Sequence, residues 1–152
     1  MNGRGMHVGG TPKTSKAMAA VIRAVAKARG LDLTKVGAHT RVENEPYMAL
    51  VIEVIGPHLI SVAQYGEQNG DPMCDPEMIF STATTDGSFL PVSYRNDYAG
   101  SFRQCTTVDA AGQPLGFMPG EVRDQVSFAN TWARNLKEQG FIAAAKRPAP
   151  GE

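Results

Sequence analysis

The 152-residue sequence contains few cysteines and no long hydrophobic run. Its two cysteines, Cys74 and Cys105, are too few to form a disulfide scaffold. No stretch approaches the roughly 20 apolar residues that span a membrane, and the first ten residues lack the apolar segment of a secretory signal. These absences exclude the disulfide-rich and membrane-spanning classes, so we expect a cytoplasmic protein with reduced thiols and no membrane partner.

The sequence also lacks the motifs of the common catalytic classes. It has no Gly-x-Ser-x-Gly nucleophile elbow, no histidines or cysteines paired at zinc spacing, and no phosphate-binding loop after a strand. Its three histidines, His7, His39 and His58, are scattered, which is typical of surface positions. We therefore expect no cofactor, and a binding function is better supported than an enzymatic one.

Charge is balanced overall but segregated along the chain. Fifteen basic residues balance fifteen acidic ones. Residues 1–41 hold eight basic residues and one acidic residue, whereas residues 42–101 hold nine acidic residues and one basic residue. One interpretation is that the basic first helix folds back onto an acidic sheet. The other is that the acidic segment forms a surface for a basic partner.

Five aromatic residues in and next to the acidic segment have the chemistry to stack on nucleic-acid bases. They are Tyr47, Tyr65, Tyr94, Tyr98 and Phe102. The surrounding acidic residues repel phosphate groups, however. We therefore expect no direct binding of nucleic acid by this part of the chain.

Apolar periodicity predicts the order helix, strands, helix. Ser15 or Thr14 is suited to cap a first helix that ends at Arg29, with Gly30 after it, and a second helix is predicted to begin at Pro119 and to stop at Gly140. Strands are predicted at residues 47–55, 59–65, 77–82, 89–94 and, as a fifth, 102–108. The pattern predicts an α+β fold: an antiparallel β-meander of about four to five strands, with the N-terminal and C-terminal helices packed on one face.

The composition divides the chain into one domain and two ends. We expect a single α+β domain over residues 14–141. Residues 1–13 are rich in glycine and predict a flexible basic arm, while residues 142–152 end in proline and glycine and predict a frayed tail.

The segment from Glu67 to Glu77 concentrates oxygen ligands in what we expect to be a loop. Asp71, Asp75 and Glu77 are candidate ligands for a divalent cation, since close carboxylates repel one another and a cation relieves that repulsion. The alternative is structural: Asn69 and the following glycine favour a turn, and the two Asp-Pro pairs are rigid. No lysine occurs from residue 36 to residue 136, which argues against a metal-dependent nuclease.

Two segments carry a resemblance to a known family. Residues 42–80 contain Tyr-Met-x-Leu, Glu-x-Ile-Gly, Ile-Ser-Val-Ala, Gln-Asn-Gly-Asp and Asp-Pro-Glu-Met, and residues 128–141 read FANTWARNLKEQGF. Over about two thirds of its length the chain resembles small uncharacterised proteins of proteobacterial plasmids, integrative elements and phages, which form a domain of unknown function. Gln64 stands where the family pattern has histidine. The resemblance implies a setting among accessory genes of mobile DNA, which often include inhibitors of host defence.

Our leading hypothesis is a non-enzymatic accessory protein of a mobile element that binds a protein or ribonucleoprotein complex of the host, such as a CRISPR effector or a restriction enzyme. Its acidic surface would imitate nucleic acid. The candidate contacts are Glu43, Glu45, Glu67, Asn69, Asp71, Asp75, Glu77 and Asp97. One alternative is a divalent-metal-dependent hydrolase that uses Asp71, Asp75 and Glu77. Another is a DNA-associated regulatory or partition protein that acts through the basic arm and first helix. Homo-oligomerisation stays open in each case.

Overall fold

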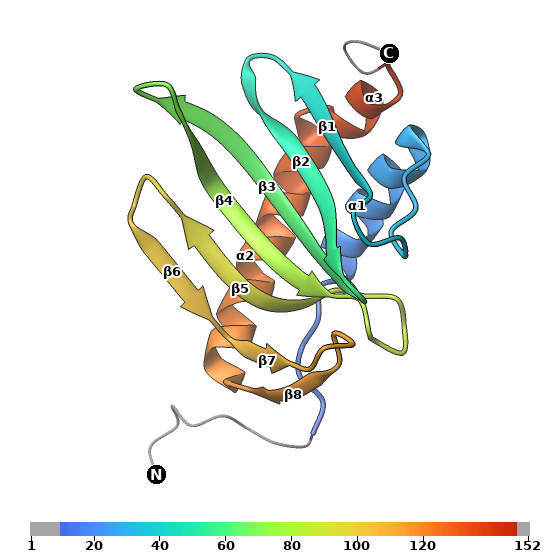
Figure 1. The fold of residues 1–152 in the computed structure, drawn as a ribbon, viewed down its shortest axis with the longest axis vertical. Helices are drawn as coiled ribbons and strands as arrows, with labels where there is room; N and C mark the ends of the chain where they lie inside the picture. Colours follow the sequence, from blue (N-terminus) through green and yellow to red (C-terminus); the bar gives the residue numbers. More distant parts are fainter. Residues whose placement is uncertain (1–9, 149–152) are drawn as a thin grey trace.

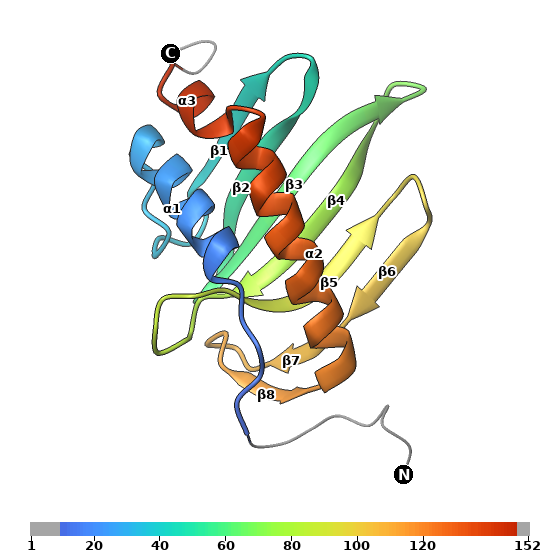
Figure 2. The same cartoon turned by 180° about the vertical axis from the view of Figure 1, so that it is seen from behind.

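A curved antiparallel sheet carries three helices on one of its faces, as the computed structural model shows for residues 10–148 (Figure 1 and Figure 2). The elements in chain order are α1 (Lys16–Arg29), β1 (His39–Asn44), β2 (Tyr47–Gly56), β3 (Leu59–Gln68), β4 (Asp71–Ser81), β5 (Leu90–Asn96), β6 (Ser101–Gln104), β7 (Thr106–Val108), β8 (Pro114–Phe117), α2 (Pro119–Glu138) and α3 (Phe141–Ala145). The α+β class is therefore confirmed. The predicted arm lies largely in residues 1–9, and His7 with it, outside the described residues.

Helix α1 begins and ends where the sequence predicts. The Ser15 side chain accepts a hydrogen bond of 3.0 Å from the backbone N–H of Met18, and Gly30 follows the helix with a φ of 64°. Glycine adopts this left-handed conformation without strain. The buried face of α1 is apolar, and it packs against α2 and the sheet. Its buried residues are Met18, Ala19, Val21, Ile22, Val25 and Ala26.

The main sheet has six strands in the order β1 to β6, so the prediction of four to five was too low. The strand that was missed, β1, buries only Val42 and is otherwise polar, so it carries no apolar signal. The predicted strand at residues 102–108 is divided between two sheets. Its first part is β6, and its second part is β7, which pairs with β8 in a separate two-stranded sheet.

The central strands confirm the predicted meander and refine its details. A bulge occurs at Val92, because the register steps from Ile79–Ser93 to Phe80–Pro91. The core lies between the sheet and the helices. Its largest fully buried side chains include Phe80, Phe89, Phe141, Met18, Ile22, Leu50, Ile52 and Leu136.

The chain beyond α2 forms a short packed helix, α3, over the first residues of the predicted tail. Gly140 has a φ of 88° and separates α2 from α3. Phe141, Ala144 and Ala145 are buried, and the carbonyl of Ala145 accepts a hydrogen bond of 2.7 Å from the Arg29 side chain. Residues 149–152 of the predicted tail lie outside the described residues. Within residues 10–148, the helices are too short or too polar to cross a membrane.

Candidate partner-binding groove and acidic hairpin end

Three turns bring most of the acidic candidate residues to the same end of the sheet. In an antiparallel meander alternate turns lie at one end, so the β1–β2, β3–β4 and β5–β6 turns project together beyond α2 (Figure 2). We call this region the acidic hairpin end. Its acidic residues are Glu43, Glu45, Glu67, Asp71, Asp75 and Asp97, and Asn69 lies in the β3–β4 turn.

The segment from Glu67 to Glu77 is a hairpin, not the loop that we expected. Asn69 and Gly70 form its two-residue turn with φ values of 53° and 84°, and β4 begins at Asp71. Positive φ at both central residues is the signature of a type I′ turn, which suits the twist of the flanking strands. The turn signal was therefore correctly recognised, but the acidic residues after it lie on a strand.

Asp75 and Asp97 hold the β5–β6 turn against β4. The Asn96 side-chain amide donates a hydrogen bond of 2.6 Å to Oδ1 of Asp75, and the backbone N–H of Cys74 donates one of 2.9 Å to Oδ2 of Asp97. The bond from the Cys74 N–H to the carboxylate lowers the pKa of Asp97, and Arg95 contributes further. These two carboxylates therefore have structural partners.

Glu77 lies on the sheet face opposite the helices, away from the turns. Its carboxylate accepts a hydrogen bond of 2.7 Å from the Ser61 hydroxyl and forms an ion pair of 3.8 Å with Arg95. Tyr65 is on the same face, and its pKa is raised by burial and then by the nearby Glu77 charge. Cys74 is buried beside them, and its pKa is raised to about 11, chiefly by burial.

Asp71, Asp75 and Glu77 do not converge on a metal-binding position. Asp75 follows Asp71 by four residues along an extended strand, a separation of about 13 Å at roughly 3.3 Å per residue. Asp75 and Glu77 also have different partners, Asn96 and Ser61. Across residues 10–148, no group of three or more histidine, cysteine or acidic residues is arranged to hold a metal ion. The arrangement does not support the metal-dependent hydrolase.

The acidic segment is not neutralised by the basic helix. Among residues 10–148 there are three ion pairs, and none involves α1: Arg41–Glu43, Arg95–Glu77 and Arg103–Glu121. Arg23 of α1 donates instead to the carbonyl of Gly87. Glu45, Glu67 and Asp71 are exposed and take part in none of these pairs. Helix α1 thus packs on the sheet, as the first interpretation expects, but among residues 10–148 it forms no ion pair with the acidic segment.

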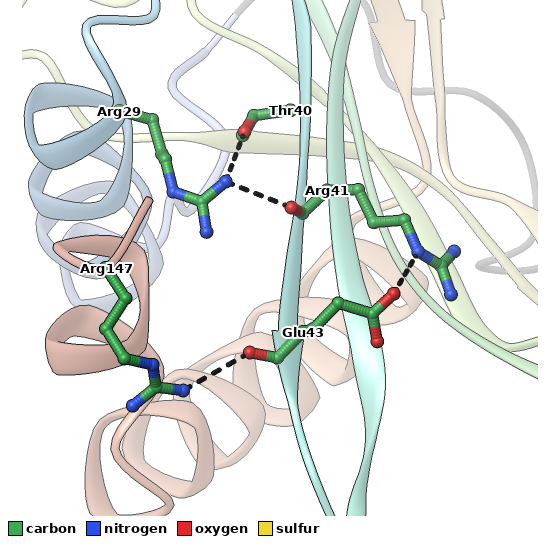
Figure 3. A network of polar contacts seen from close by, with 5 residues as sticks. All are labelled: Arg29, Thr40, Arg41, Glu43 and Arg147. Atoms are coloured by element: carbon green, nitrogen blue, oxygen red, sulfur yellow. Dashed lines mark hydrogen bonds and ion pairs between the residues drawn. The ribbon is translucent and has the colours of Figure 1, made fainter. Parts of the chain in front are cut away.

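Arginines cover the outer edge of β1 instead (Figure 3). The Arg29 guanidinium donates to the hydroxyl of Thr40 at 3.4 Å and to the carbonyl of Arg41 at 3.1 Å. Arg147 reaches the carbonyl of Glu43 at 3.5 Å, while the Glu43 carboxylate pairs with the Arg41 side chain at 2.7 Å. Because an uncovered edge strand invites pairing with other chains, these contacts protect the edge of the sheet.

A groove of about 1190 Å³ lies between the β1–β2 and β3–β4 hairpins. This volume exceeds that of most small-molecule pockets. Ala49, Val51 and Tyr65 contribute apolar or aromatic surface, and Glu43, Glu45 and Glu67 contribute acidic groups. The full lining is His39, Arg41, Glu43, Glu45, Pro46, Tyr47, Met48, Ala49, Val51, Tyr65, Gly66, Glu67, Gly70 and Pro72.

The acidic residues of this groove were predicted from the sequence, whereas its apolar ones were missed. Alternation along β2 places Ala49 and Val51 on one face, which was a usable signal. Nothing in the local sequence showed that the hairpins enclose a groove. The five aromatic residues do not form one stacking surface, since Tyr94 packs on Phe128 of α2 whereas Phe102 lies under Arg95.

A family model described as a domain of unknown function (DUF6908) matches residues 18–142. No curated protein and no solved structure matches the chain.

Proposed function

The chain belongs to this family of unknown function, and from that premise we propose that it is a non-enzymatic binding protein whose acidic hairpin end binds a basic macromolecular partner. The observation that carries the proposal is the exposure of Glu45, Glu67 and Asp71 without any ion pair among residues 10–148. Complementary charge across an interface speeds association and rejects wrong partners. Three charges that form no ion pair within the described part of the chain are available for that role.

The setting is part of the same proposal. The resemblance to proteins of plasmids, integrative elements and phages supports a protein that mobile DNA encodes and that acts in the bacterial cytoplasm. A host protein or ribonucleoprotein complex with a nucleic-acid-binding groove, such as a CRISPR effector or a restriction enzyme, has the basic surface that this acidic end complements. By covering that surface, the protein would inhibit the complex.

The test is affinity capture of partners from a bacterial lysate with matched charge variants. In one variant Glu45 and Glu67 are both changed to lysine, and in the control Asp124 and Glu138 of α2, which are exposed, are changed in the same way. Both variants change the net charge equally. We expect the first to lose the partner that the wild type and the control retain, and we expect added salt to weaken capture.

A partner retained equally by both variants, and indifferent to salt, would show that the acidic hairpin end is not the binding surface. The purified partner then allows a direct measurement of inhibition. If binding leaves the DNA or RNA affinity of that partner unchanged, the inhibitory role is wrong.

A further inference from the structure

The groove lies where the sheet divides between β2 and β3. The pairing of these strands ends at Ala49–Tyr65, although β2 begins two residues earlier and β3 continues to Gln68. Beyond this point the start of β2 pairs only with β1, and the end of β3 pairs only with β4. Figure 1 shows the two hairpins diverging from each other. The end of β3 therefore presents an internal strand edge.

The backbone N–H and C=O groups of Glu67 lie on this edge. The two-residue turn at residues 69–70 makes Gln68–Asp71 the closing pair of the β3–β4 hairpin, and such a pair is hydrogen-bonded. Hydrogen-bonded and non-bonded pairs alternate along an antiparallel ladder. The next pair, Glu67–Pro72, is therefore non-bonded, which agrees with the absence of an N–H on proline. The N–H and C=O of Glu67 consequently point away from β4 and toward the groove.

Side chains close the opposite side of this gap. A Cβ placed on Gly66 would lie 2.6 Å from the hydroxyl of Tyr98 and 3.3 Å from the sulfur of Met48, so both side chains lie against this glycine. The Gln64 side chain donates a hydrogen bond of 3.0 Å to the carbonyl of Met48, which pairs that backbone group. One strand edge, at Glu67, is left for a ligand.

The charged residues that line the groove favour a basic ligand. Arg41 is neutralised by Glu43 at 2.7 Å, whereas Glu45 and Glu67 have no ion-pair partner among the described residues. They lie on opposite hairpins, so acidic groups face the groove from both sides. Ala49 and Val51 between them suit small apolar side chains. A chain that alternates basic and apolar residues matches both features, because side chains of a strand alternate between its faces.

We propose that the groove binds an extended basic segment of the partner protein, which adds a short strand beside Glu67. Main-chain hydrogen bonds to Glu67 would provide affinity, and lysine or arginine side chains would reach Glu45 and Glu67. This inference rests on the proposed function, because it specifies the part of the partner that enters the acidic hairpin end.

The test is an NMR titration of the full-length protein with a synthetic heptapeptide of alternating lysine and valine. We expect chemical-shift changes at the groove and slower hydrogen exchange of the Glu67 amide. A heptapeptide of alternating glutamate and valine should not bind. Two lysine–valine peptides, methylated on the lysine or on the valine backbone nitrogens, keep their charge but each loses the donors of one strand edge, and at least one should bind about tenfold more weakly. Equal binding of both methylated peptides and the parent peptide, or no binding of the parent peptide, would overturn strand addition.

Two variants of Glu67 separate charge from backbone. Glu67→Gln removes the charge and keeps the N–H, whereas Glu67→Pro removes both. Because the Glu67 N–H is not used by β4, proline should be accommodated, and the thermal midpoint of each variant checks the fold. We expect the proline variant to bind the peptide several-fold more weakly than the glutamine variant. Equal affinities would show that the backbone of Glu67 is not involved.

The lysate experiment distinguishes this inference from the proposed function. If reversal at Glu45 and Glu67 abolishes capture but Glu67→Pro and Glu67→Gln behave alike, the partner binds as a folded basic surface and only the groove inference fails. If charge reversal has no effect on capture, both fail. Slower exchange at Glu67 that depends on protein concentration without peptide would identify a second copy as the occupant, and this too would overturn the inference.

Discussion

The indole Nε1 of Trp132 donates a hydrogen bond of 2.9 Å to the side-chain oxygen of Gln64. Gln64 in turn donates to the carbonyl of Met48, so one side chain joins α2 to β3 and β2 beside the groove. Trp132 is only 4% exposed, which leaves its N–H little access to water. Both contacts of the Gln64 side chain are therefore structural.

Replacing Gln64 with leucine should therefore destabilise the protein. The change leaves the Trp132 N–H buried without an acceptor, which costs about 1–3 kcal/mol. Gln64→His should cost less, because a neutral imidazole offers one acceptor and one donor. Urea unfolding of the three proteins measures the difference. A leucine variant as stable as the wild type would show that the Trp132 bond contributes nothing.

Gly112→Ala should be among the most damaging single changes. A Cβ at this position would lie 2.2 Å from the carbonyl oxygen of Pro57, and the backbone φ is 78°. Both the clash and the backbone conformation oppose any side chain, so we expect the free energy of unfolding to fall by about 3–5 kcal/mol. Gly70→Ala is the matched control, because its φ is 84° but no atom lies within 4 Å of the added Cβ. The control should lose only about 1–2 kcal/mol. Equal losses in urea unfolding would exclude the contact with Pro57 as the cause.

The contribution of Asp97 to the stability of the folded protein should depend on pH. Its pKa is lowered in the folded protein by the hydrogen bond from the Cys74 N–H, so the carboxylate is favoured over the acid by folding. The stabilisation is therefore complete above the ordinary carboxyl pKa of about 4 and is lost as pH falls through the lowered value. Asp97→Asn should be less stable than the wild type at pH 7, with a difference that shrinks below about pH 4. A difference independent of pH would contradict this.

Both cysteines should be unreactive in the folded protein. Burial raises the pKa of Cys74 to about 11 and that of Cys105 to about 12, so both thiols are protonated at neutral pH. With Ellman's reagent at pH 8, we expect reaction at least about a hundredfold slower than in denaturant. The single variants Cys74→Ala and Cys105→Ala show which of the two thiols accounts for any reaction that remains in the folded protein. A thiol that reacts as fast in the native state as in denaturant would show that its site opens readily.

Much of the fold is predictable because its signals are local. Ser15 and Gly30 bound α1 through contacts within a few residues, and the β2 and β3 strands have strong apolar patterns. Strand β1 was missed because five of its six residues are not buried. It is held by pairing with β2, by Arg29 of α1 and by Arg147, which follows α3 and lies 104 residues away from Glu43 in the sequence.

The sequence by itself determined the α+β class, the start and end of α1, the turn at residues 69–70 and the segregation of charge. These depend on propensity, periodicity and composition, which act over short distances. Only the tertiary structure decided which acidic residues are available. Asp75, Asp97 and Glu77 are bound by residues 16 to 23 positions away, whereas Glu45 and Glu67 face one groove where β2 and β3 separate. The hydrogen-bond partners of these carboxylates and the groove itself both result from strand register and sheet curvature, because these determine which distant side chains meet.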